Sequence, residues 1–269
     1  MADSPGYEEM LYERKGAVAL ITLNRPEKLN AWTPRMEGEF LDALDRASQD
    51  RQVVVLVVTG AGRAFCAGGD ISVWSDNLAA RGTAAPSSPL LARDGSPEVP
   101  IALSRSKPII AAINGPAIGI GLTMPLACDI RIASERATFS ARFVKVGLTP
   151  ECGSTRYLPL VAGVSNALFL ALTGRIIDAA EAKERGLVDR VVPHERLMEE
   201  AMSLAQEIAA NPPDAVWSAK RLIHQNAVES DLRRVVTHEG FAIREMRALP
   251  DHAEAVRAFM EKREPRFSR

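Results

Sequence analysis

Two glycine-rich segments could do chemistry through their main-chain N–H groups rather than through side chains. Residues 63–71 read R-A-F-C-A-G-G-D-I and residues 114–122 read N-G-P-A-I-G-I-G-L, each directly after an apolar run. Small residues let a ligand approach the main chain, and the first N–H groups of a helix lack internal partners. Two such turns side by side could direct two N–H donors at one oxygen, which is a backbone oxyanion hole. The alternative is that these glycines serve only tight turns.

Common catalytic motifs are absent from the sequence: it contains no H-E-x-x-H, no P-loop and no G-x-S-x-G. Residues 60–65 (G-A-G-R-A-F) and 119–124 (G-I-G-L-T-M) each begin like a dinucleotide fingerprint, but Phe65 and Met124 stand where the third glycine belongs. Nicotinamide binding is therefore a distant alternative. The four histidines and the three cysteines have no metal-ligand spacing and form no disulfide framework. We expect no metal and no cofactor, and a reducing compartment, the cytoplasm.

Apolar runs and turn signals predict the elements that would position the two segments. The chain is extended over 7–24, and buried strands are expected at 53–59, at 108–113 and near 128–133. These runs are continuous rather than alternating, which is typical of strands covered on both faces. A helix should begin at Thr33-Pro34. Strands separated by helices predict an α/β fold. The helix should bury an apolar face formed by Met36, Phe40, Leu41 and Leu44.

The last third of the chain has helical periodicity. Apolar residues recur at helical spacing over 194–210, the run 211–213 (N-P-P) interrupts them, and further helical stretches continue to about residue 262. We expect an α/β core over 1–192 and a helical region over 193–269 in the same structural unit. Residues 75–106 lack periodicity and predict a long loop, either a lid over a substrate or a disordered insertion.

Length, composition and charge exclude several classes of protein. The chain has 269 residues, of which 46% are apolar and 25% charged, as in one large folded domain. Its net charge of -1 provides no positive electrostatic field that would attract the phosphate backbone of a nucleic acid. We therefore expect no nucleic-acid binding. Two uncharged windows, 108–128 and 157–174, approach the length of a membrane span. Prolines and glycines interrupt both, so we expect buried interior and no membrane span, with the second window forming two short helices.

Several ordered motifs extend over nearly the whole chain: residues 23–31 (L-N-R-P-E-K-L-N-A), 64–71, 107–130, 146–150 (V-G-L-T-P), 172–174, 179–188 and 258–263 (A-F-M-E-K-R). With these motifs in this order, the chain resembles the enoyl-CoA hydratase/isomerase (crotonase) family. The resemblance implies an α/β fold, a spiral of ββα units with a helical C-terminal trimerisation region. It also implies homotrimers or dimers of trimers, and a coenzyme A thioester as substrate, so that coenzyme A belongs to the substrate.

When the functional positions of the family are matched one by one to this chain, the resemblance assigns binding roles to particular residues. The two oxyanion-hole amides fall on Ala67 and Ile120, the second of which is commonly glycine in the family. Phe259 and Lys262 match a C-terminal pair that contacts coenzyme A, often from a neighbouring subunit. For Lys28 and Lys262 the alternative is a solvated surface charge. The residues expected to line the thioester and nucleotide path are Lys28, Ala31, Ala64, Gly68, Gly69, Asp70 and Ile71.

The chain departs from the family at the two glutamates that hold water in the hydratases. The first aligns with Thr123 and the second with Phe143. Neither side chain accepts a proton at neutral pH, because the threonine hydroxyl is far too weak a base and phenylalanine has no titratable group. The usual hydration dyad is therefore absent.

One carboxylate stands at a position relevant to the family. Glu151 follows the G-L-T-P turn, where several Δ3,Δ2-enoyl-CoA isomerases carry Asp or Glu. Its uncharged sequence neighbours should raise its pKa toward the range useful for proton transfer. A single base that removes a proton and returns it elsewhere suits isomerisation. The alternative role is an acidic residue in the first turn of a helix.

The sequence therefore predicts an enoyl-CoA isomerase with Glu151 as its base. Two alternatives stay open. One is hydration or another enolate reaction on the same scaffold, with Thr123 holding a water. The other is an acyl-CoA-binding subunit without catalytic activity.

Overall fold

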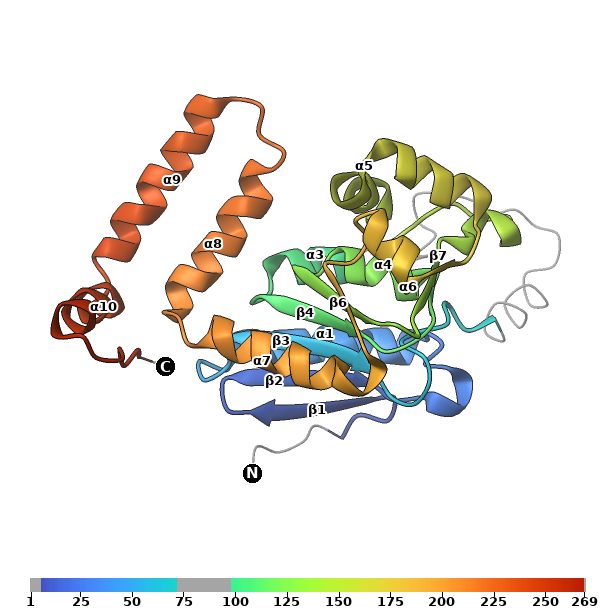
Figure 1. The fold of residues 1–269 in the computed structure, drawn as a ribbon, viewed down its shortest axis with the longest axis horizontal. Helices are drawn as coiled ribbons and strands as arrows, with labels where there is room; N and C mark the ends of the chain where they lie inside the picture. Colours follow the sequence, from blue (N-terminus) through green and yellow to red (C-terminus); the bar gives the residue numbers. More distant parts are fainter. Residues whose placement is uncertain (1–5, 72–97, 269) are drawn as a thin grey trace.

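A six-stranded sheet forms the centre of the computed structural model, which describes residues 6–71 and 98–268. The strand order is β1-β2-β3-β4-β6-β9 (Figure 1). The first pair, β1 with β2, is antiparallel, and every other neighbouring pair is parallel. The strands are β1 (Met10–Lys15), β2 (Val18–Leu23), β3 (Val55–Gly60), β4 (Ile109–Ile113), β6 (Ile130–Ser134) and β9 (Arg190–Val192).

Both faces of this sheet are covered, as the continuous apolar runs predict. In β2, Ile21 belongs to the apolar cluster that includes the buried face of α1 (Pro34–Gln49), whereas Leu20 belongs to the cluster that includes α7 (Leu197–Ala209). Successive side chains of a strand point to opposite faces, so β2, β3, β4 and β6 each contribute to both clusters. The edge strand β1 contributes only to the first cluster, through Met10 and Tyr12. The expected strands at 53–59, 108–113 and 128–133 are confirmed as β3, β4 and β6, with shifts of one or two residues.

The helix expected at Thr33-Pro34 is confirmed as α1. Thr33 caps it by accepting a hydrogen bond from Met36 N at 3.0 Å, and Pro34 occupies the first turn, where it loses no helical hydrogen bond. Met36, Phe40 and Leu44 are buried, as the pattern predicts, while Leu41 is half-buried at the edge of the same face.

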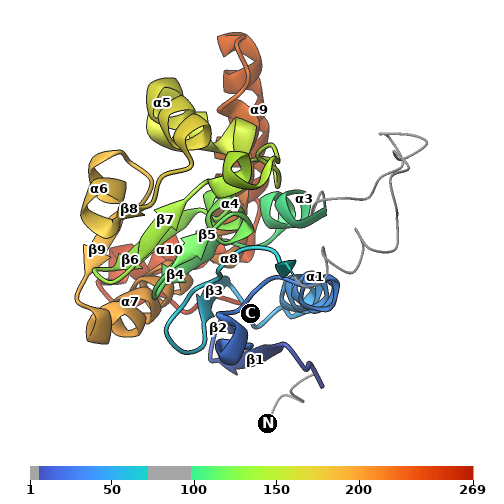
Figure 2. The ribbon, with the colours of Figure 1, turned by 90° about the vertical axis from the view of Figure 1, so that its right-hand side faces the viewer.

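A smaller sheet lies beside the first, in the order β5-β7-β8 (Figure 2). Its strands are β5 (Ala117–Ile118), β7 (Thr138–Ser140) and β8 (Ile177–Asp178). The remaining helices are η1 (Pro26–Lys28), α3 (Glu98–Arg105), α4 (Ile120–Leu126), η2 (Arg142–Val146), α5 (Ser154–Thr173), α6 (Ala179–Glu184), η3 (His194–Arg196), α8 (Pro213–Asn226), α9 (Leu232–Arg247) and α10 (Pro250–Glu261).

The C-terminal third is helical, as expected. Helix α7 packs on the main sheet through Leu197, Ala201 and Ala205, while α8, α9 and α10 extend away from the sheet (Figure 1). The division into 1–192 and 193–269 stays a prediction. Helix α7, which follows that boundary, packs against the core.

The expectation of buried interior holds for 108–128 and is wrong for 157–174. Strand β4 and helix α4 are buried along their whole lengths. Helix α5, in contrast, buries only Ser154, Leu158, Ala167 and Leu170. It consists of two helices joined at Gly163, whose φ of 77° is left-handed, which confirms the expected interruption.

Helix α5 is also the one helix of the described chain that is long and apolar enough to cross a membrane. Length and composition alone are weak evidence for a span.

The expectation of a continuous loop over 75–106 is wrong at its C-terminal end. Residues 98–105 form α3, which buries Val99, Pro100 and Leu103. Residues 72–97 lie outside the described part of the chain, so the choice between a lid and a disordered insertion stays open.

Candidate active site

Two buried asparagines hold the first glycine-rich turn, which follows β3. Asn30 Nδ2 donates to the carbonyl oxygens of Ala61 and Ala64 at 2.9 and 2.8 Å. Asn114 Nδ2 donates to Gly62 O at 3.0 Å, and its Oδ1 accepts from Gly60 N at 3.1 Å. Because side-chain amides satisfy the carbonyl oxygens, the turn can leave the sheet without losing hydrogen bonds. Sequence reasoning quoted both asparagines as motif residues and assigned them no role.

An arginine ties the same turn to the segment before α1. Arg25 donates through one guanidinium nitrogen to Ala31 O at 2.7 Å and to Asp70 Oδ2 at 3.1 Å. Its Nε lies 3.3 Å from Glu9 Oε1. These ion pairs are largely buried, so the charges act at low screening. The segment around Ala31 and the turn that ends at Asp70 are thereby held together, as the proposed coenzyme A path requires.

The amide of Ala67 does not fit the role that the sequence assigned to it. Its N–H donates to Leu29 O at 3.0 Å and is therefore already used within the protein. Trp32 N donates to Gly68 O at 2.8 Å, and Asp70 N donates to Trp32 O at 2.9 Å. These two bonds make a parallel bridge between Trp32 and Gly69. In such a bridge the N–H of the bridged residue itself points away from the neighbouring segment.

The Gly69 amide, in contrast, points away from the neighbouring segment and is the candidate donor of the first turn. Within residues 6–71 and 98–268, Gly69 N–H donates to no other protein group. The predicted donor, Ala67, lies two residues before Gly69 in the same turn. The alternating hydrogen-bond directions of residues 67–70 decide the donor, and they depend on Leu29 and Trp32, which are distant in sequence.

The second turn brings Ile120 against the first. Ile118 N donates to Cys66 O at 2.9 Å, and a side chain on Gly121 would lie 2.1 Å from the same oxygen. Ile120 is the first residue of α4, so its N–H has no partner in the helix, and in the described chain it donates to no other group. The Ile120 side chain is buried in the core.

The Glu151 carboxylate lies beside α4. Thr123 Oγ1 donates to Glu151 Oε1 at 3.0 Å, and Glu151 Oε2 is buried. Glu151 precedes the left-handed residues Cys152 and Gly153, with φ of 55° and 69°, so a tight turn carries it rather than the helix itself. The structure therefore brings Thr123, Glu151 and the N-terminus of α4 together.

Phe143 closes another side of this region. It is buried at 7% exposure in η2, and its ring carbons lie 4.0 Å from where a side chain on Gly119 would begin. The two positions that hold glutamates in the hydratases are thus occupied by one hydroxyl and one apolar ring. Glu151 provides a carboxylate that Thr123 contacts directly.

Two buried thiols flank the carboxylate. Burial raises the pKa of Cys66 to about 12, and the negative charge of Glu151 adds to the effect. Burial also raises the pKa of Cys152 well above its usual value, again with a contribution from Glu151. Both thiols are therefore neutral near pH 7, and Cys66, Cys128 and Cys152 are all buried and free of disulfides.

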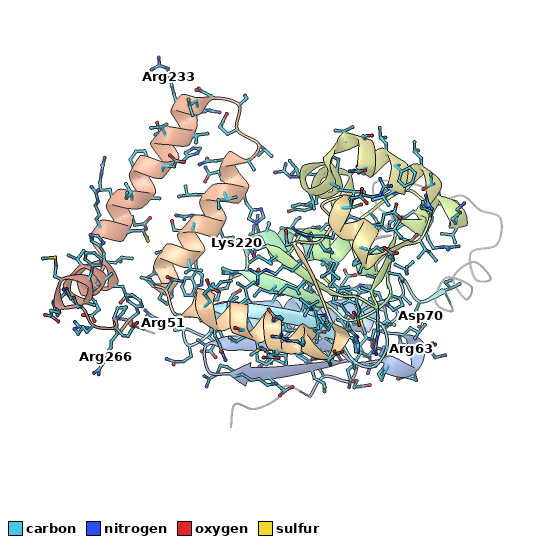
Figure 3. The ribbon with its side chains drawn as sticks, in the orientation of Figure 1. Arg51, Arg63, Asp70, Lys220, Arg233 and Arg266 are labelled. Carbon is cyan, nitrogen blue, oxygen red and sulfur yellow. The ribbon has the colours of Figure 1, made fainter. Side chains whose placement is uncertain are left out.

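The other expected binding residues divide into two groups. Around the first turn, Lys28 is exposed, Ala64 and Gly68 are buried, and Ile71 is 65% exposed. Figure 3 shows Asp70 at the same end of the sheet as Arg63.

Phe259 and Lys262 lie at the end of α10, on the opposite side of the molecule from that turn (Figure 1). One chain alone does not bring this pair to the site. Phe259 is 81% exposed.

A hollow of about 480 Å³ lies elsewhere, between α3, α8 and α9, and is lined by Lys107, Trp217 and Ser218 among others. None of the candidate residues lines it.

The comparisons with known proteins place this fold in one family. The chain matches the enoyl-CoA hydratase/isomerase family model over residues 13–269, and it belongs to that family. It is an acyl-CoA enzyme with the α/β crotonase fold.

Particular relatives carry both kinds of activity in their names. The chain is 36% identical to a 1,2-epoxyphenylacetyl-CoA isomerase of Escherichia coli (strain K12), covering 97% of this chain and 98% of the relative. It is 33% identical to a 2,3-dehydroadipyl-CoA hydratase of the same organism, covering 96% and 98%. The structure of an enoyl-CoA hydratase from Bacillus anthracis superposes with a TM-score of 0.85 at 34% identity, covering 97% and 99%.

Proposed function

We propose that this enzyme is a Δ3,Δ2-enoyl-CoA isomerase in which Glu151 is the only base. The observation that carries the proposal is the contact of Glu151 with Thr123, which stands at the position of a hydratase glutamate. With Thr123 and Phe143 at the two hydratase positions, water would have no pair of carboxylates to activate it. Overall identity favours neither activity, because the similar relatives include an isomerase and hydratases.

In this mechanism the amides of Gly69 and Ile120 donate to the thioester oxygen of the substrate. Glu151 removes a proton from C2 of a 3-enoyl thioester, and negative charge develops on that oxygen. The same carboxyl group returns the proton to C4, which leaves the 2-enoyl thioester with no net gain or loss of atoms. Each amide donor is expected to contribute about 3 kcal/mol, and the placed base about 10²- to 10⁴-fold in rate.

The binding path extends from this centre along the first turn. Lys28, Ala31 and residues 68–71 would line the thioester and the nucleotide, with Arg25 fixing Ala31 relative to Asp70. Coenzyme A is part of the substrate, and the mechanism needs neither metal nor redox cofactor. The three buried free thiols support the proposed cytoplasmic location.

We further propose a homotrimer, or a dimer of trimers, as the assembled form. Four leucine and valine side chains spaced four residues apart along α5 are more than half exposed, and an apolar stripe of this kind marks an interaction surface. The exposed Phe259 and Lys262 would then contact coenzyme A from a neighbouring subunit. The four side chains are Leu160, Val164, Leu168 and Leu172.

The decisive experiment is Glu151→Gln, assayed by conversion of 3-hexenoyl-CoA to the 2-enoyl product. We expect a loss of about 10²- to 10⁴-fold in kcat, because the amide cannot accept the proton. Glu195→Gln, an exposed glutamate on η3, is the control and should leave kcat unchanged. Isomerase turnover retained by Glu151→Gln would remove Glu151 from the mechanism. Hydration of crotonyl-CoA faster than isomerisation by the unaltered enzyme would favour a hydratase.

A further inference from the structure

The hydroxyl of Thr123 is directed away from its own helix. A threonine inside a helix commonly donates to the carbonyl four residues earlier, here Gly119 O. That oxygen accepts the main-chain N–H groups of Leu122 and Thr123, both at 2.9 Å. The hydroxyl donates instead to Glu151 Oε1 at 3.0 Å. The hydrogen bond therefore joins α4 to the turn that precedes α5.

This bond supplies an orientation that the main chain alone cannot give. The turn at Cys152 and Gly153 fixes where the Glu151 side chain begins, but a glutamate side chain has three rotatable bonds beyond that point. Thr123 is only 1% exposed and is branched at Cβ, so its own side chain has few accessible rotamers. A stiff donor on a buried helix can hold one carboxylate oxygen in place.

The same helix begins at Ile120, whose amide is one of the two proposed oxyanion donors. The Ile120 amide and the Thr123 hydroxyl belong to residues three positions apart, which is less than one turn of helix. We propose that Thr123 is a positioning residue for the isomerisation: it holds the Glu151 carboxylate in a fixed place relative to the Ile120 amide. This inference rests on the proposed function, because it concerns the base of that reaction.

The hydrogen bond also has an electrostatic consequence. A donor to the ionised carboxylate favours the charged form, the one that can remove a proton. The other titratable groups with an electrostatic effect in this region are Cys66, Cys128, Cys152 and Glu37 on α1, and the Thr123 hydroxyl also interacts with the Cys152 sulfur. The three thiols stay protonated below pH 9, so they do not contribute to an acid limb of the rate profile.

The test compares variants of Thr123 in the full-length enzyme, with 3-hexenoyl-CoA as substrate. Thr123→Val removes the hydroxyl at nearly constant volume, and Thr123→Ala removes it without the branched side chain. We expect each to lower kcat about 10-fold or more with KM unchanged. The acid limb of the pH profile of kcat should move up by about one pH unit. Thr123→Ser, which keeps the hydroxyl, should keep most of kcat and the original profile.

Two further variants separate this inference from the proposed function. In a Glu151→Gln background, Thr123→Val should cause no additional loss, because the two residues act as one unit. Glu37→Gln should leave the acid limb in place. If Glu151→Gln is inactive while Thr123→Val and Thr123→Ala keep the original kcat and profile, Thr123 has no positioning role and the isomerase proposal stands. A higher KM at unchanged kcat would also overturn the inference. Turnover retained by Glu151→Gln would overturn the proposed function itself.

Discussion

Lys220 Nζ lies 2.9 Å from Asp129 Oδ2, and this ion pair joins α8 to the start of β6. Asp129 also accepts from Ile109 N at 2.8 Å and lies 2.9 Å from His224 Nε2. One carboxylate thereby holds the beginnings of two neighbouring strands and one helix of the C-terminal region. The helices beyond α7 are therefore attached to the core by buried polar contacts as well as by apolar ones.

Replacing Lys220 by methionine should lower the free energy of unfolding by about 1.5–3 kcal/mol, because the largely buried Asp129 would lose a charged hydrogen-bond partner and keep only His224 and the Ile109 amide. Urea denaturation at one fixed protein concentration measures the loss. Arg221→Met on the same helix is the control, since its ion pair with Glu245 spans 3.8 Å and is exposed. It should change stability by less than about 1 kcal/mol. Equal effects of the two variants would contradict the assigned role of Lys220.

Gly121→Ala should impair both stability and isomerase activity. The added carbon would lie 2.1 Å from Cys66 O and 2.8 Å from Cys66 C, and main-chain atoms cannot move aside without displacing the turn. Moving α4 outward would separate the amides of Gly69 and Ile120. We expect a loss of about 10²-fold in kcat, comparable with the loss of one oxyanion donor.

Gly240→Ala on α9 serves as the control for this prediction, because nothing lies within 4 Å of the added carbon. It should raise stability by up to about 1 kcal/mol through helix propensity. Activity in Gly121→Ala equal to that of the unaltered enzyme would show that the two turns can separate without harm.

The buried thiols predict a dependence of stability on alkaline pH. The pKa values of Cys66 and Cys128 are raised from 9.0 to about 12 by burial. Above pH 9 the unfolded chain loses these protons while the folded chain keeps them, so the stability they contribute below pH 9 is lost as the pH rises toward 12. Urea midpoints measured from pH 8 to pH 11 should therefore fall.

The same thiols should resist labelling by iodoacetamide at pH 8 in the folded enzyme and react once urea unfolds it. The double variant Cys66→Ala, Cys128→Ala provides the comparison and should show a weaker fall of the midpoint with pH. Rapid alkylation of the folded enzyme at Cys66 would contradict the burial of that thiol.

Leu168→Arg should dissociate the proposed trimer. Leu168 lies in the middle of the exposed apolar stripe of α5 and is 53% exposed in the single chain, so a charge there harms assembly more than folding. Light scattering should give about three or six times 29.1 kDa for the unaltered protein and a lower mass for the variant. Leu11→Arg on the edge strand β1 is the control, with 45% exposure away from this stripe. An unaltered protein that is monomeric would refute the proposed assembly.

The sequence predicted the elements well where local rules decide them. Thr33 and Pro34 are the cap and first turn of α1, and the apolar run that ends at Thr59 is a strand covered on both faces. Both results follow from neighbouring residues alone, through capping and through continuous hydrophobicity.

Long-range contacts decided what the sequence did not predict. Apolar residues on α5 suggested an interior, because hydropathy does not distinguish a core from an exposed apolar surface. The sequence assigned a free amide to Ala67, but this amide donates to Leu29 O, a hydrogen bond that depends on how two segments meet. The bond from Thr123 to Glu151 was equally hidden, since 28 residues separate its partners.

The close packing of Gly121 against the carbonyl of Cys66 implies that substrates are selected by the radius of the acceptor atom. Because main chain packs against main chain there, the two proposed donors, Gly69 and Ile120, have no freedom to move apart. A substrate analogue with sulfur in place of the carbonyl oxygen has a longer double bond and a larger acceptor. Such a dithioester should be rejected by its size, even though its α-hydrogen is more acidic than that of the natural compound.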